Sequence, residues 1–147
     1  MRHIKTVVIT VITYAFVLLF TYAAVSKLLD FENFRVQLAQ SPLLGAYAGV
    51  VADSVVLAEL LVAAMLCYRR TQSAGLAASF LLMLLFSGYI LWLLMRGSAL
   101  PCTCGGLLER MSWPQHLAFN LVCVVLAAAG WLTNRKKRSY DRPVDAC

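Results

Sequence analysis

The sequence predicts an all-α integral membrane protein, a four-helix bundle with a short amphipathic outer helix between spans 1 and 2. The 147-residue chain is 61% hydrophobic and only 14% charged, with a mean hydropathy of +0.76. So few charges cannot cover the surface of a soluble domain. Four apolar runs also reach the roughly 20 residues that a helix needs to cross the hydrocarbon core. Lipid is therefore the expected solvent.

The four apolar runs define the predicted spans, and charged or turn-forming segments separate them. The runs cover Thr6–Leu28, Leu43–Cys67, Gly75–Met95 and Leu117–Thr133. They predict a four-span membrane domain over residues 1–134, followed by a basic cytoplasmic tail over residues 135–147. The first run could instead be a signal peptide, because the basic segment MRHIK precedes it. Its apolar stretch is longer than the roughly 7–15 residues typical of signal peptides, which favours an uncleaved helix.

The segment between the first two spans, DFENFRVQLAQ, has its own pattern. Phe31, Phe34 and Leu38 fall along one side of a helix, with charged residues between them. This spacing predicts a short amphipathic helix lying on the outer membrane surface.

Positive charge predicts the orientation, because cytoplasmic segments carry an excess of Lys and Arg. With the N-terminus inside, nine basic residues are cytoplasmic: Arg2, Lys5, Arg69, Arg70, Arg135, Lys136, Lys137, Arg138 and Arg142. Four are outside: Lys27, Arg35, Arg96 and Arg110. Both termini are therefore expected in the cytoplasm, and the net charge of +6 indicates contact with lipid headgroups and not with nucleic acid.

This topology separates the five cysteines. Only Cys102 and Cys104, in the segment PCTCGG, face the outer compartment, where disulfides form and persist. A bridge between residues two apart closes a very small ring and needs a turn, which Pro101 and the two glycines that follow the pair suit. Such a bond is strained and labile, and it stabilises the fold little because the loop is short. The pattern favours redox exchange over a structural staple.

Other roles for the two cysteines stay open: a bridge to another protein, a plain structural bond, or free thiols. A metal site is disfavoured, because the segment adds only His116 to two thiolates, short of the four ligands of a closed zinc site. His116 or Arg110 could support the pair by stabilising a thiolate, although interfacial packing is the simpler explanation for His116.

Three charged residues fall within or at the edge of the spans. Asp53 and Glu59 lie in the second span and Lys27 at the outer end of the first. An acid at mid-membrane costs roughly 2.5–3.5 kcal/mol, so such residues usually face the bundle interior with a partner. Lys27 extends to the headgroups, pairs with one of the acids, or forms a binding site for a polar ligand. Their depths along the two spans argue against a Lys27–Glu59 pair unless a helix tilts or kinks.

The chain resembles the MauE family, which is grouped with the DoxX-like, redox-associated membrane proteins. The similarity lies in YAAVSKLLDFENF after the first span, LAELL in the second, and PCTCGG followed by SW before the fourth. It implies a bacterial inner-membrane four-helix bundle active in periplasmic disulfide chemistry, as in methylamine dehydrogenase maturation. It also implies that Cys102 and Cys104 form the redox pair and that Lys27 and Glu59 are polar positions of the family.

The chain departs from quinone-linked relatives in having no second outward cysteine pair and no intramembrane CxxC. The cofactor is therefore undefined, with a quinone left open. We expect a thiol-disulfide oxidoreductase whose partner is a periplasmic thioredoxin-like or disulfide-rich protein. The alternative is a non-catalytic accessory subunit or assembly factor of a larger envelope membrane complex. A transporter or lipid-binding bundle is a third option, which the small number of spans disfavours.

Overall fold

The structure of the protein is a computed structural model that describes residues 2–96 and 112–140. The described residues form five α-helices and one 3-10 turn, in the order α1 Arg2–Leu29, α2 Phe31–Ala39, η1 Gly45–Tyr47, α3 Ala48–Cys67, α4 Gln72–Met95 and α5 Trp113–Tyr140. Four stretches are long and apolar enough to cross a membrane: Thr6–Leu29, Gly45–Cys67, Gln72–Met95 and Pro114–Arg135. The predicted all-α, four-span architecture is confirmed.

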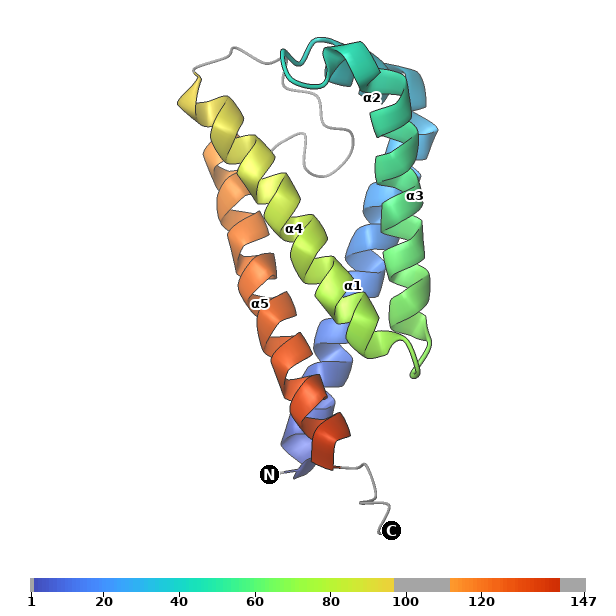
Figure 1. Ribbon diagram of the computed structural model, residues 1–147, viewed down its shortest axis with the longest axis vertical. Coiled ribbons are helices and arrows are strands. Elements are labelled where there is room, and N and C mark those ends of the chain that lie inside the picture. The colour runs from blue at the N-terminus through green and yellow to red at the C-terminus, as the bar shows by residue number, and fades with distance from the viewer. Residues whose placement is uncertain (1, 97–111, 141–147) are drawn as a thin grey trace, which may run out of the picture.

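The spans pack as two pairs, α1 with α3 and α4 with α5 (Figure 1). The start of α1 and the end of α5 lie together, which we call the termini end of the bundle. The amphipathic helix α2, the end of α4 and the start of α5 lie at the opposite end, which we call the α2 end. An even number of spans requires this arrangement, because each span returns the chain to the other side.

Small side chains let the helices approach each other. Gly75, Ser79 and Ser87 of α4 are buried, and a Cβ on Gly75 would lie 3.0 Å from Leu66 Cδ2 of α3. Three small residues of α5 are also buried: Cys123, Ala127 and Gly130. In lipid, helix association depends on close van der Waals contact, because hydrocarbon solvates apolar side chains as well as protein does. Cys123 is thus a small buried hydrophobe in the core of the bundle.

The two buried seryl hydroxyls of α4 are satisfied within the helix. Ser79 Oγ donates to the Gly75 carbonyl at 2.8 Å, and Ser87 Oγ donates to the Met83 carbonyl at 2.8 Å. These bonds remove the cost of burying a hydroxyl without a partner. The two buried serines of α4 are therefore small, and each of their hydroxyls is hydrogen-bonded to a carbonyl of the same helix.

The boundary of the second span differs from the prediction. We predicted a start at Leu43, but α3 begins at Ala48, after a turn and the η1 segment. The Gly45 amide donates to the Ser41 carbonyl at 2.9 Å, and a Cβ on Gly45 would lie 2.7 Å from the Ala39 carbonyl oxygen. Glycine permits this tight reversal, which brings the end of α2 back over the start of α3.

The fourth span also extends further than its apolar run. Its membrane-length part ends at Arg135, and α5 continues to Tyr140. The first residues of the predicted basic tail therefore continue the helix. Residues 141–147 lie outside the described part of the chain.

Candidate functional site

An ion pair joins α1 and α3 inside the bundle. Lys27 Nζ lies 2.8 Å from Glu59 Oε1, and the Glu59 side chain is only 1% exposed. Lys27 also donates to the Ala23 carbonyl at 3.3 Å, one turn back along α1. The lysine therefore points away from the end of its own helix and does not extend to the headgroups. Pairing reduces the cost that either charge would carry alone in this setting.

The predicted difference in depth between Lys27 and Glu59 does not occur, because the four spans do not begin and end at the same height in the bundle. At the termini end, α1 and α5 continue past the turn that joins α3 to α4 (Figure 1). The α3 helix is thus displaced toward the α2 end, and the middle of α3 meets the last turn of α1. Lys27 closes the remaining gap by folding back toward Ala23.

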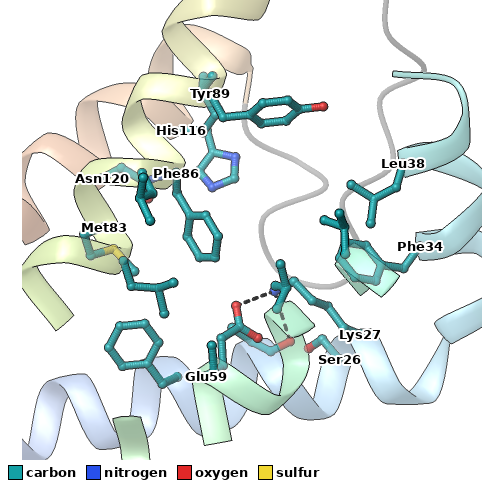
Figure 2. Close-up of a pocket in the computed structure, with 18 of the residues that line it drawn as sticks. Ser26, Lys27, Phe34, Leu38, Glu59, Met83, Phe86, Tyr89, His116 and Asn120 are labelled. Atoms are coloured by element: carbon teal, nitrogen blue, oxygen red, sulfur yellow. Dashed lines mark hydrogen bonds and ion pairs between the residues drawn. The ribbon is translucent and has the colours of Figure 1, made fainter. Parts of the chain in front are cut away.

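A cavity of about 540 Å³ opens beside the ion pair, and all five helices contribute to its walls. Its volume lies within the range of small-molecule sites, roughly 300–1,000 Å³. Most of the lining is apolar, and each helix except α3 supplies an aromatic side chain: Phe20, Phe34, Phe86, Tyr89 and Phe119. Figure 2 shows Phe34 and Phe86 on opposite walls, with Glu59 and Lys27 below them.

Polar side chains converge on the cavity from several directions. Lys27 and Glu59 come from the α1–α3 pair, and His116 and Asn120 come from α5 (Figure 2). Asn120 is 4% exposed, so its amide belongs to the interior. An apolar cavity with a few converging polar groups is the usual form of a binding site.

One polar atom beside this cavity has no hydrogen bond within the part of the chain that the structure describes. Glu59 Oε2 is buried and accepts no hydrogen bond from a described residue, whereas the other carboxylate oxygen, Oε1, accepts from Lys27. A buried carboxylate oxygen without a donor is costly, at about 1–3 kcal/mol or more for a charged group. The atom therefore marks a place where a further donor would bind.

The amphipathic helix α2 closes the cavity at its own end. Phe34, Gln37 and Leu38 line the cavity, so the apolar side predicted to rest on the membrane surface faces the protein. Asn33 donates to Asp30 at 2.8 Å at the start of the helix. Tyr89 of α4 donates to Ser41 Oγ at 2.8 Å just after the helix. The first bond is local to the start of α2, and the second connects the segment after α2 to α4.

The two acids of α3 have opposite surroundings. Glu59 is buried beside the cavity, as we expected of an acid within a span. Asp53 is exposed on the outside of the bundle, in a shallow apolar hollow with Leu28, Phe31 and Leu57, so the expectation that it faces the interior is wrong. A separation of six residues places them about 120° apart around the helix, which accounts for the difference.

The predicted redox residues Cys102 and Cys104 lie outside the described residues, as does Arg110. The described helices bound their segment: α4 ends at Met95 and α5 begins at Trp113, both at the α2 end. His116 is near the start of α5 and lines the cavity. Within the described residues, no group of three His, Cys, Asp or Glu side chains could hold a metal ion.

Sequence reasoning missed the cavity and three of its residues. Tyr89, Asn120 and Phe86 were not predicted from the sequence to line a cavity. A signal was present for Asn120, because an amide three residues before Cys123 on the same helix face is unusual in an apolar span. The aromatic residues carried no such signal, because their shared position depends on how the helices cross.

The fold and this cavity define a class of protein: a multi-pass membrane bundle of four spans with a buried ion pair beside an internal cavity. The family model described as methylamine utilisation protein MauE matches residues 5–133. The chain belongs to the MauE family, whose description connects it with methylamine utilisation. No curated protein and no solved structure matches the chain.

Proposed function

We propose that this protein exchanges electrons with a periplasmic thiol protein through Cys102 and Cys104. The observation that carries the proposal is the position of the CxC segment in the chain, between α4 and α5, whose facing ends lie at the α2 end beside the cavity. The CxC segment is joined in the chain to α4 on one side and to α5 on the other, and these two helices pack closely together. Membership of the MauE family, described as methylamine utilisation protein MauE, supports a role connected with methylamine utilisation.

The exchange proceeds by thiolate attack on a disulfide. A partner thiolate attacks one sulfur of the Cys102–Cys104 bond, which breaks and leaves the other cysteine as a thiolate. A second partner thiolate then attacks the mixed disulfide. The partner gains a disulfide and gives up two electrons, the cysteine pair gains them, and the two protons pass to the new thiols. The reverse sequence of the same steps reduces the partner.

The test is a trapping experiment with single cysteine variants. Cys104→Ser removes the thiol that resolves the mixed disulfide when Cys102 attacks a partner disulfide, so this mixed disulfide should accumulate and be visible on a non-reducing gel. Cys67→Ser is the matched control, because Cys67 is an exposed thiol at the opposite end of the bundle. If both Cys102→Ser and Cys104→Ser leave the thiol state of envelope proteins unchanged and trap nothing, the exchange function is excluded.

The proposed orientation places the protein in a bacterial inner membrane with both termini in the cytoplasm. The charge bias of the sequence supports it. A membrane-impermeant maleimide added to intact spheroplasts should label reduced Cys102 and Cys104 and leave Cys147 unlabelled. Labelling of Cys147 alone would reverse the orientation.

A second candidate function is an accessory subunit of a larger membrane complex, and Asp53 favours it. A carboxylate exposed on the outside of a membrane span is costly in lipid, roughly 2.5–3.5 kcal/mol at mid-membrane, whereas a basic or hydroxyl group of a neighbouring span would pair with it. Asp53→Asn should then reduce the yield of a co-purifying membrane partner, whereas the thiol exchange function predicts no such loss.

A further inference from the structure

The cavity beside Lys27 and Glu59 has the features of a ligand site that the thiol chemistry does not use. We propose that it binds a membrane-soluble molecule with a hydroxyl-bearing aromatic ring, the hydroxyl held between Glu59 and Lys27. This inference goes beyond the proposed function and does not rest on it, because no cysteine enters the argument.

The hydroxyl is inferred from the hydrogen-bonding groups that the site leaves available. Glu59 Oε2 has no donor among the described residues. Lys27 has three N–H groups, and its bonds to described residues are those to Glu59 Oε1 and the Ala23 carbonyl. The site therefore offers one acceptor and one donor on neighbouring side chains. A hydroxyl is the smallest group that satisfies both, because it donates and accepts at one oxygen.

The positions of Glu59 and Lys27 allow both side chains to contact a ligand hydroxyl in the cavity. Glu59 and Lys27 both line the cavity, and Figure 2 shows the pair on its floor. The last torsion of a glutamate side chain is broad, so a small rotation of the carboxylate turns an oxygen toward a ligand. The Lys27 side chain is 23% exposed, which leaves its ammonium group within reach from the cavity.

The aromatic ring is inferred from the walls. Phe20, Phe34, Phe86 and Phe119 come from four different helices. Aromatic pairs prefer offset-stacked or edge-to-face contacts, which walls on several sides of a ring provide. An engineered cavity of roughly 150 Å³ holds benzene. A volume of about 540 Å³ therefore accommodates a substituted ring and the first part of an apolar tail.

The test measures binding to the purified full chain in lipid nanodiscs, with three probes that share one decyl tail. The first is a hydroquinone, the second its dimethyl ether and the third an aliphatic alcohol. The hydroquinone should bind at least about tenfold more tightly than the ether, because the hydroquinone donates a hydrogen bond to the charged Glu59 carboxylate and the ether has no O–H donor. Equal binding of these two excludes the hydroxyl contact, and equal binding of the hydroquinone and the aliphatic alcohol excludes the ring.

Variants assign the binding to this cavity. Glu59→Gln should bring hydroquinone and ether affinities to within about threefold of each other, whereas Asp53→Asn on the same helix should keep the full difference. Ala58→Phe fills the cavity from its α3 wall and should weaken all three probes. Ala58→Phe thereby keeps the proposal testable if Glu59→Gln fails to fold. Unchanged hydroquinone binding in Ala58→Phe would place the ligand elsewhere and overturn the proposal.

The binding measurement and the trapping experiment test separate proposals, so a negative result in one does not decide the other. The double variant Cys102→Ser/Cys104→Ser should bind the hydroquinone as the natural chain does. Loss of binding in that variant would contradict a site built from the helices alone. A failure of the mixed-disulfide test, in contrast, leaves the hydroxyl preference unaffected.

Discussion

The termini half and the α2 half of the bundle are built from the same four spans and are packed in opposite ways. Near the termini, a Cβ on Gly130 would lie 3.2 Å from Ile12 Cγ2 and 3.4 Å from Leu76 Cδ2, so three helices meet there with no spare space. Gln72 also donates to Thr13 at 3.0 Å across the same region. Near α2, aromatic and charged side chains line a cavity. Small residues bring membrane helices together, and large or charged ones separate them.

The α2 half depends most strongly on its ion pair, so breaking the pair should give the largest effect. Lys27→Met leaves Glu59 buried and unpaired, which should lower the free energy of unfolding by about 3–5 kcal/mol. Thermal unfolding in detergent measures the effect, with Asp53→Asn as the control because that acid is exposed. The double variant Lys27→Met/Glu59→Leu should recover most of the loss. An effect of Lys27→Met no larger than that of Asp53→Asn would contradict the buried pair.

Overpacking the termini half should give an intermediate effect. Gly130→Leu forces a side chain against Ile12 and Leu76 and should cost about 1–3 kcal/mol. Gly88→Leu is the matched control, because a Cβ on Gly88 would meet nothing within 4 Å. Its unfolding free energy should stay within about 0.5 kcal/mol of the parent protein. Similar losses in the two variants would mean that the helices do not pack closely at Gly130.

The smallest effect should come from the bond that holds α2 over the cavity. Tyr89→Phe removes the hydroxyl that donates to Ser41 and should cost about 0.5–1.5 kcal/mol. Tyr47→Phe serves as the control, because that side chain is 71% exposed. Amide hydrogen exchange should also be faster in residues 31–39 of Tyr89→Phe alone. Unchanged exchange there would show that α2 is held by its other contacts.

The four spans and the amphipathic helix could be predicted because each depends on local composition. The Lys27–Glu59 pair could not, since the prediction assumed level spans and the structure displaces α3 toward the α2 end. Asp53 was assigned to the interior by the same rule as Glu59, although the two acids lie about 120° apart around α3 and only Glu59 is on a buried face. The cavity has no sequence signature, because its aromatic residues are distributed over several helices.

The most direct test of this account is a measurement of the contact between the Lys27 ammonium and the Glu59 carboxylate in a lipid bilayer. Solid-state NMR on the chain labelled with ¹⁵N in lysine and ¹³C in glutamate can detect dipolar coupling between Nζ and Cδ. The 2.8 Å separation of Nζ and Oε1 predicts a detectable coupling that Lys27→Arg and Glu59→Gln each abolish or displace. No coupling in the natural chain would show that α1 and α3 do not meet at Lys27 and Glu59. That result would also contradict the binding site proposed beside this pair.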